Sequence, residues 1–254
     1  MEVDLVANST SVMTGAQGQL FYSVNEPTPP GPSVRTLTRI DTATGSKAQV
    51  VAGWSSRALM SAAGDKLYTI DLNSHRMWRV SSATLLDESA GPEGDWPNPR
   101  MMAATDEGIF VIEGMRLWRS NPDSLADDVA GPEGDWGNAR MIAALDGKIF
   151  VIDATRLWRV DPNTLINEGA GPEGDWPNPR MMAAVNGRLF VIEGPRLWRV
   201  DPATLVNDGA GPEDDWPGAK AIATDGSGLF VVDGSGDLWK VDQVNLNKLA
   251  RVGL

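Results

Sequence analysis

The sequence GPEGDWGNARMIAALDGKIFVIDATRLWRVDPNTLINEGA, residues 131–170, decides the fold, because near-copies of it follow one another along the chain. Weaker copies cover residues 11–45, 58–85 and 221–246, which brings the total to six and accounts for most of the 254 residues. A repeat with a fixed period is the first signal to interpret in a sequence, because it points to a repeat architecture. The opening hexapeptide recurs at intervals of 40 residues, at Gly91, Gly131, Gly171 and, as GPEDDW, at Gly211.

Within one copy, turn signals separate four short strands. The first is the Met-Ile-Ala-Ala segment, and the second is Ile149–Ile152, a continuous apolar run of the kind that is covered on both faces. Asp-Gly before that run is a strong hairpin signal, because both residues tolerate a positive φ. Leu-Trp-Arg-Val is the third strand and ends at Asp161-Pro162, a turn pair; Leu165–Ala170 is expected to be a polar fourth strand. The hairpin pair is Asp146-Gly147, Asn186-Gly187 or Asp225-Gly226 in successive copies.

Four antiparallel strands in about 40 residues are typical of one blade of a β-propeller. We therefore expect an all-β, six-bladed propeller that forms a single domain over residues 1–254. Gly and Pro occur too often for a helical solenoid of the same period. Glu2–Ala7 and Lys248–Leu254 both resemble a fourth strand, so the two terminal segments are expected to close the ring, one of them completing the last sheet.

Composition excludes several classes of function. The chain has 34 acidic and 22 basic residues, a net charge of −12, no cysteine and one histidine, His75. The acidic balance argues against nucleic-acid binding, and the missing cysteine excludes a thiol nucleophile or a cysteine-based zinc site. No apolar run approaches the ~20 residues that span a bilayer, and the N-terminus does not resemble a signal peptide. We expect a monomer in the cytoplasm, or released without a signal peptide, that needs no cofactor.

Function is expected on the face that carries the GPEGDW linkers and the turns between second and third strands, because these loops are the longest and most varied. An insertion, Glu26–Val34, and the shortened linker with Trp54 and Arg57 fall on the same face. The recurring polar residues there are Asp95, Trp96, Asn98, Arg100, Glu113 and Arg116; Asp135, Trp136, Asn138, Arg140, Asp153 and Arg156; Asp175, Trp176, Asn178, Arg180, Glu193 and Arg196; and Asp215 with Trp216.

Tryptophan beside carboxylate, amide and guanidinium groups is the chemistry of sugar recognition. An indole covers the apolar face of a pyranose, and the polar groups pair with its hydroxyls. Several similar sites on one disc gain strength through avidity. A structural interpretation stands beside this one: the linker tryptophans can be plugs between blades, Arg100 can tie one loop to the next, and Glu113 with Arg116 can be a surface pair. The strand tryptophans, such as Trp118, are expected to pack between blades.

The pattern GDW-x-N-x-R, followed by the G-K/R-h-F-V-I-D strand and by R-L-W-R-V-D-P-x-T-L, resembles tectonin-type repeats over Ser11–Leu246. The resemblance implies a closed propeller, related in architecture to tachylectin-2, that binds glycans in pockets between blades. It also implies a role in innate defence and, in some fungal members, recognition of O-methylated sugars. The complete polar set occurs only in the middle copies of this chain, and copies one, two and six depart from the pattern.

Two functions therefore remain in competition. The first is a multivalent lectin for glycans, with methylated or microbial sugars as candidates. The second is a non-enzymatic scaffold whose linker face docks a polypeptide. An enzyme with a metal in the central channel is disfavoured, because the expected inner strands carry no carboxylate that could hold the metal on the axis.

Overall fold

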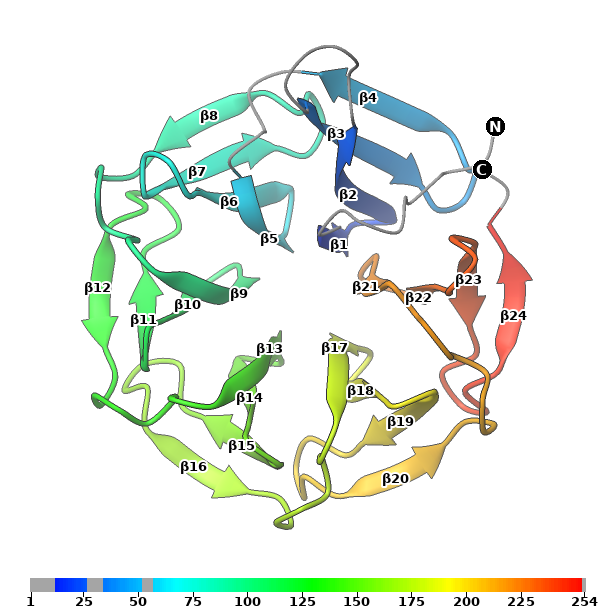
Figure 1. Cartoon of the computed structure of the whole chain (residues 1–254). Coiled ribbons are helices and arrows are strands. Elements are labelled where there is room, and N and C mark those ends of the chain that lie inside the picture. Colours follow the sequence, from blue (N-terminus) through cyan, green and yellow to red (C-terminus); the bar gives the residue numbers. More distant parts are fainter. Residues whose placement is uncertain (1–11, 27–33, 52–56, 253–254) are drawn as a thin grey trace.

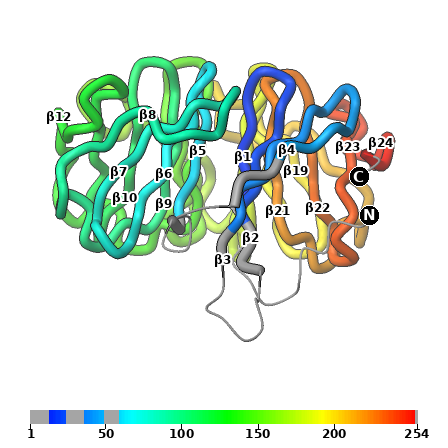
Figure 2. The backbone as a smooth tube through the Cα atoms, turned by 90° about the horizontal axis from the view of Figure 1, so that it is seen from above, coloured from blue at the N-terminus to red at the C-terminus, as the bar shows by residue number. Residues whose placement is uncertain are grey.

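The computed structural model describes residues 12–26, 34–51 and 57–252. In this part of the chain, 24 strands form six separate four-stranded antiparallel sheets. The sheets stand around a central axis as the blades of a propeller, and the first strand of each blade lies nearest the axis (Figure 1). Seen from the side the molecule is a disc (Figure 2). The six-bladed, all-β propeller that the repeats predict is thus confirmed.

The strands of each blade follow one another from the axis outward. Blade 1 comprises β1 (Val12–Ala16), β2 (Gln19–Glu26), β3 (Val34–Asp41) and β4 (Lys47–Val51). Blade 2 comprises β5 (Arg57–Ala63), β6 (Lys66–Asp71), β7 (Arg76–Ser81) and β8 (Asp87–Ala90). Blade 3 comprises β9 (Pro99–Thr105), β10 (Gly108–Glu113), β11 (Arg116–Ser120) and β12 (Asp127–Ala130).

The second half of the ring repeats this plan. Blade 4 comprises β13 (Ala139–Leu145), β14 (Lys148–Asp153), β15 (Arg156–Val160) and β16 (Asn167–Ala170). Blade 5 comprises β17 (Pro179–Val185), β18 (Arg188–Glu193), β19 (Arg196–Val200) and β20 (Asn207–Ala210). Blade 6 comprises β21 (Ala221–Thr224), β22 (Leu229–Val232), β23 (Leu238–Val241) and β24 (Lys248–Arg251).

The hydrophobic core lies between neighbouring blades rather than within one. Between blades 3 and 4, Phe110 and Leu117 pack against Ile149 and Val160, and all four side chains are buried. The second strands are apolar on both faces because each face meets a different neighbouring blade. Burial of both faces of the second strands stabilises the ring, since removal of apolar surface from water is the main driving force of folding.

Antiparallel strands put alternate connections on opposite faces of the disc. We call linker face the side with the linkers 91–98, 131–138, 171–178 and 211–218 and the turns from second to third strands. We call turn face the side with the turns from first to second and from third to fourth strands.

Two turns differ from their prediction. The fourth strand of blade 4 begins at Asn167 rather than Leu165, because Leu165 has a φ of 57° and closes the preceding turn onto Asp161. In blade 6, Asp225-Gly226 is not a two-residue hairpin. There the carboxylate of Asp225 accepts hydrogen bonds from the backbone N–H groups of Ser227 (2.8 Å) and Gly228 (2.6 Å), which widens the loop.

Ring closure joins blade 6 to blade 1. The C-terminal segment supplies β24, as one of the two terminal segments was expected to do; Glu2–Ala7 lies outside the described residues. Leu20 packs against Phe230 across the junction, and Thr42 Oγ1 donates to Asp225 Oδ2 at 2.6 Å. In the described part of the chain, no helix is long and apolar enough to cross a membrane.

Candidate functional site

The four linker tryptophans are buried between blades. Trp96, Trp136 and Trp216 are 0% exposed and Trp176 is 1% exposed, so none offers a ring face to a sugar. The Trp136 backbone N–H donates to the Met115 carbonyl of the preceding blade (3.1 Å), and its ring packs with Leu117 and Ile149. The expectation that these rings are sugar platforms is therefore wrong for this structure, and the alternative, a plug between blades, describes them.

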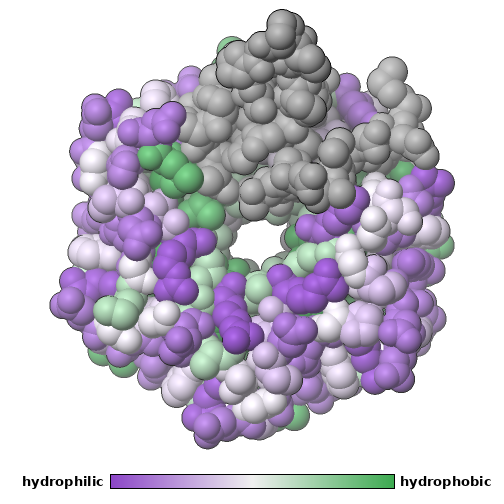
Figure 3. Space-filling view, in the orientation of Figure 1, coloured by the Kyte–Doolittle hydropathy of each residue, from purple (hydrophilic) through white to green (hydrophobic). Residues whose placement is uncertain are grey.

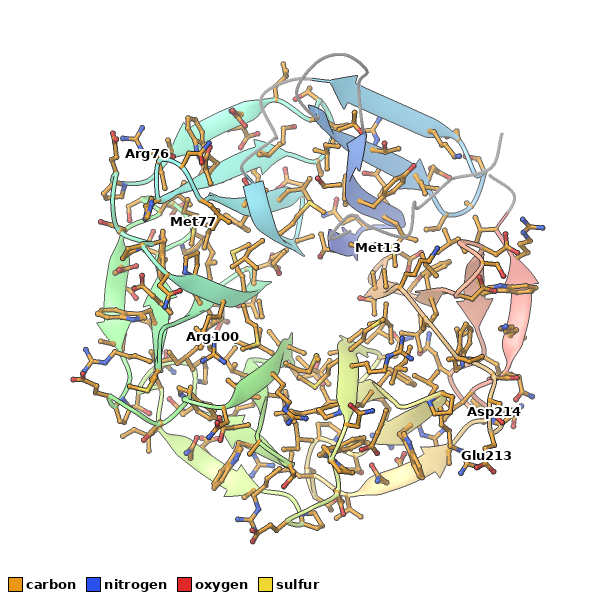
Figure 4. The ribbon with its side chains drawn as sticks, viewed as in Figure 1. Met13, Arg76, Met77, Arg100, Glu213 and Asp214 are labelled. Atoms are coloured by element: carbon orange, nitrogen blue, oxygen red, sulfur yellow. The ribbon has the colours of Figure 1, made fainter. Side chains whose placement is uncertain are left out.

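The linker arginines tie one linker to the next. Arg100 donates to the carbonyls of Gly114 (2.7 Å) and Ala139 (2.7 Å), and Arg180 donates to those of Gly194 (2.8 Å) and Ala219 (2.6 Å). In the middle linker, the exposed Arg140 donates to the Pro177 carbonyl (3.1 Å). Figure 4 labels Arg100 between the ribbons of blades 3 and 4. These guanidinium groups satisfy backbone acceptors of the next linker or blade and, for Arg100 and Arg180, of their own blade as well, a structural role that the sequence left open.

The acids at the ends of the second strands hold their own linker. Glu113, Asp153 and Glu193 accept hydrogen bonds from the backbone N–H groups of Asn98 (3.0 Å), Asn138 (2.9 Å) and Asn178 (3.0 Å). Burial raises the pKa of Asp153, and the N–H of Asn138 acts against that rise. The expected surface pair of Glu113 with Arg116 is replaced by a pair of Arg116 with Glu133 of the next linker (3.1 Å).

The arginines of the second-to-third turns cover the strand tryptophans. The guanidinium carbon lies 5.4 Å from the ring centre for Arg116 over Trp118 and for Arg156 over Trp158. For Arg196 over Trp198 the same distance is 5.1 Å. These tryptophans are partly buried and pack into the cores between blades, as predicted. The cation–π contact shields the part of each ring that remains in contact with solvent.

The rest of the predicted set forms a solvated polar rim. Asn98, Asn138, Asn178 and Asp135 are exposed, whereas Asp95, Asp175 and Asp215 are partly exposed. Figure 3 shows the hydrophilic colour of this face around the open channel, and Figure 4 places Glu213 and Asp214 at its edge. Of the remaining predictions, Trp54 and residues 27–33 lie outside the described residues, as does the side chain of Arg57.

A pocket that the sequence did not predict lies on the turn face, between blades 4 and 5. It has a volume of about 270 Å³, and Leu145, Phe150, Pro202 and Ala203 give it an apolar lining. Its charged residues are Asp146, Lys148, Arg159 and Glu168.

The charged groups of this pocket hold one another in place. Lys148 Nζ lies 2.8 Å from Glu168 Oε1, and Arg159 Nε lies 3.7 Å from Glu168 Oε2. Arg159 then crosses to blade 5 and donates to the carbonyls of Pro202 (3.1 Å) and Ala203 (2.8 Å). An apolar floor and an ordered charged rim are what ligand pockets usually combine.

The same polar arrangement recurs in neighbouring grooves between blades. Arg79 pairs with Glu88 (3.3 Å), Arg119 with Asp128 (2.9 Å) and Arg199 with Asp208 (2.7 Å), and each guanidinium also bonds a turn carbonyl of the next blade. A signal for it was present in the sequence, because Lys148, Arg159 and Glu168 recur one repeat later as Arg188, Arg199 and Asp208. Short turns flank these residues, and loop length therefore points to the opposite face.

Two further cavities lie on the axis. The channel, about 210 Å³, is lined by the six inner strands. It opens on the turn face into a funnel of about 600 Å³, whose rim includes Gln17, Asp106, Asp146 and Asn186. The described residues contain no group of three or more His, Cys, Asp or Glu side chains placed to hold a metal ion.

Fold and repeats together define a six-bladed β-propeller with linked polar loops on one face and inter-blade grooves on the other. Comparison with solved structures supports the fold. A chain from the crystal structure of a nidogen/laminin complex has a TM-score of 0.65 and 12% identity, over 96% of this chain and 93% of that one. Kluyveromyces lactis Hsv2 has a TM-score of 0.60 and 10% identity, over 92% of this chain and 75% of its own. No family model and no curated protein match the sequence.

Proposed function

We propose that this propeller is a non-enzymatic, multivalent carbohydrate-binding protein whose sugar sites are the inter-blade grooves of the turn face. The observation that carries the proposal is the pocket between blades 4 and 5, with its apolar lining and its charged rim. The resemblance of the repeats to tectonin-type repeats supports it, because that family binds glycans between blades.

The pocket fits the chemistry of a sugar. Pro202 and Ala203 offer an apolar wall for C–H groups or for a methyl ether. Glu168 accepts hydrogen bonds from hydroxyls, while Lys148 and Arg159 donate to them, and bonds that involve an ionised group are the stronger kind. Recurrence of the Arg–acid pair in other grooves gives the disc several related sites, so a multivalent glycan gains from avidity. Methylated and microbial glycans are the first candidates.

A glycan array that includes methylated and microbial glycans, probed with the labelled protein, tests the function. We expect selective binding that free sugar competes away. Titration calorimetry with the best ligand then compares Lys148→Ala and Glu168→Ala with Asn138→Ala, a matched change in the same repeat on the linker face. The two pocket variants should lose one binding site per molecule and Asn138→Ala none. Loss of a binding site in Asn138→Ala, with no loss in the two pocket variants, would instead support sugar sites on the linker face.

The second candidate is a protein-interaction scaffold, and the linker face favours it. Exposed carboxylates of successive linkers, Glu133, Glu173 and Glu213, stand along its rim. A partner with a basic surface would bind such a rim with strong salt dependence. This candidate predicts a silent glycan array with folded protein, and a complex of fixed stoichiometry that free sugar does not dissociate.

A further inference from the structure

The two grooves that flank blade 5 have nearly the same charged rim. In the groove between blades 5 and 6, Arg188 Nε lies 3.2 Å from Asp208 Oδ2, and Arg199 Nε lies 2.7 Å from Asp208 Oδ1. Arg199 then crosses to a turn carbonyl of blade 6, just as Arg159 crosses to one of blade 5. The charged groups alone therefore do not distinguish this groove from the pocket between blades 4 and 5.

The two grooves differ at the mouth. In the pocket, Asp146 of blade 4 and Pro202 of blade 5 are lining residues from opposite sides. Their counterparts on blades 5 and 6, which are adjacent in the ring (Figure 1), are bonded to each other: Asn186 Nδ2 donates to Gln243 Oε1 at 3.0 Å. Both amide groups also donate to the Ser227 carbonyl of blade 6, at 2.9 Å from Asn186 and 3.1 Å from Gln243. We call these three groups the amide strap, because they cross the groove from one blade to the next.

The turns that carry Gln243 and Pro202 have the same form. Asp242, just before Gln243, accepts hydrogen bonds from the backbone N–H groups two and three residues later, at 2.7 and 3.1 Å. Asp201, just before Pro202, does the same at 2.8 and 3.1 Å. The pocket cannot form such a strap, because the carboxylate of Asp146 has no hydrogen to donate and proline has no polar side-chain group.

The carbonyl on which the strap rests is held in a fixed place. Ser227 lies in the wide loop of blade 6, where its backbone N–H and its Oγ donate to Asp225 Oδ1 at 2.8 and 2.9 Å. Asp225 is 3% exposed and also accepts from Thr42 of blade 1. Because the loop is fixed in this way, the Ser227 carbonyl stays available to Asn186 and Gln243.

We propose that the amide strap closes a second ligand site, the groove between blades 5 and 6, to the class of sugar that the pocket takes. The inference rests on the proposed function, because it concerns which turn-face grooves are open to a sugar. Val185, at the floor position of the closed groove, is 4% exposed, whereas its counterpart Leu145 in the pocket is 9% exposed. Asn186 is exposed and Gln243 partly exposed, so water competes for the strap and opens it in a fraction of the molecules. A ligand that needs the open groove binds with an affinity reduced by that fraction.

The first test detects opening of the groove without a sugar. In protein with ¹³C-labelled leucine and valine methyl groups, the soluble nitroxide TEMPOL should broaden the signals of Leu145 more than those of Val185. Gln243→Pro removes one amide of the strap and inserts the residue that the pocket has, so it should raise the broadening of Val185 about twofold or more. Asn245→Ala, in the same turn but outside the strap, is the matched control and should leave Val185 unchanged. Equal broadening of Val185 in Gln243→Pro and in the unmodified protein would overturn the proposal.

The second test uses the array of methylated and microbial glycans. Gln243→Pro should keep the selectivity of the unmodified protein and bind about fivefold more tightly, since one more groove is open, whereas Asn245→Ala should bind unchanged. Unchanged binding by Gln243→Pro, with Val185 opened to the nitroxide, would show that this groove takes no sugar and would overturn the proposal. An array that stays silent for every variant contradicts the proposed function, and the nitroxide result still decides whether the strap closes the groove. If Gln243→Pro does not fold, Gln243→Ala removes the same amide without constraining the backbone.

Discussion

At the scale of single residues, Asp127 is a carboxylate in an unfavourable position. It lies at the start of β12 and accepts a hydrogen bond from Ser120 Oγ (2.9 Å). Burial raises its pKa to about 6, and the nearby charges of Asp95 and Glu113 act in the same direction. The next two repeats have Asn167 and Asn207 at this position, and an amide carries no charge to bury.

Asp127→Asn should therefore stabilise the protein at pH 7, by about 1 kcal/mol once solvent screening of a half-exposed group is allowed for. Because the folded pKa lies above the unfolded one, the native state binds more protons between about pH 4 and 6, and stability falls as pH rises through that window. The gain from Asp127→Asn should vanish near pH 4. Urea unfolding at pH 4 and pH 7 measures it.

Asp128→Asn is the matched control, because it removes the same charge from the next residue. Asp128 pairs with Arg119 at 2.9 Å, so its loss should lower stability at pH 7 rather than raise it. If both variants stabilise the protein equally, relief of the overall net charge of −12, and not burial of Asp127, is the cause.

Single residues also show where sequence reasoning fails. Trp136 stands in a linker among charged residues, which suggests an exposed ring, but its burial depends on contact with two blades that no local pattern reveals. Leu165, Leu205 and Leu246 have φ values of 57°, 61° and 62°, a backbone region that leucine seldom adopts. Burial of their side chains offsets that strain. The Asp-Pro pairs before Leu165 and Leu205 located these two turns correctly but not their shape.

At the scale of elements, the linker works as a plug that fixes two blades together. Gly131 opens it in a tightly packed position, since an added Cβ would lie 3.1 Å from both the Leu117 carbonyl oxygen and the Leu165 Cβ. Trp136→Ala should lower the free energy of unfolding by about 3–5 kcal/mol, the cost of a large buried cavity. Asn138→Ala, two residues away and exposed, should change it by less than about 0.5 kcal/mol.

Chemical denaturation of Trp136→Ala and Asn138→Ala gives the comparison directly. A similar small loss of unfolding free energy in both variants would contradict the role of Trp136 as a plug and make it a candidate sugar platform again. A large loss for Trp136→Ala alone, with sugar binding intact at temperatures where the variant is folded, agrees with grooves on the turn face as the site.

The arginine of each third strand is a second connection between blades. Arg199 pairs with Asp208 (2.7 Å) and donates to the carbonyls of Gln243 (3.1 Å) and Val244 (3.0 Å) on blade 6. Arg199→Ala should cost about 2 kcal/mol, because it removes several charge-assisted bonds, two of which join blade 5 to blade 6. Arg140→Ala, which removes one exposed bond on the linker face, should cost less than about 1 kcal/mol. Equal midpoints in guanidinium chloride for the two variants would contradict this ranking.

At the level of single elements, the sequence predicts the positions of the strands well but does not predict the pocket between blades. Apolar runs such as Ile149–Ile152 and the Asp-Gly pairs placed the strands to within two residues, because both signals are local. The pocket between blades 4 and 5 joins Lys148 to Pro202, which are 54 positions apart and meet only when the ring forms. A groove of this kind is visible in a sequence only as a polar pattern that recurs with the repeat.

At the scale of the whole molecule, the ring has one junction that differs from the others. From blade 1 to blade 5, an arginine of the third strand reaches the next blade: Arg39, Arg79, Arg119, Arg159 and Arg199. Blade 6 has Lys240 at the equivalent position. Its side chain is exposed and makes no hydrogen bond or ion pair among the described residues. Leu249 replaces the acid that would hold an arginine, and 58% of it is exposed. The junction from blade 6 to blade 1 relies instead on Asp225 and Thr42.

This junction should be where the ring opens first, and Lys240→Arg should strengthen it. The longer guanidinium can donate to the carbonyls of Thr42 and Ala43, which correspond to those of Pro202 and Ala203 at the junction of blades 4 and 5. The gain should be about 0.5–1 kcal/mol, at the low end for a charged donor because Leu249 gives the new arginine no acid partner. Hydrogen exchange should slow at β1 and β21 while β9 and β13, on the opposite side of the ring, keep their rates. Lys240→Met removes the charge without adding a donor and should leave exchange unchanged. Slower exchange in both variants, or in neither, would show that a missing arginine does not set the strength of this junction.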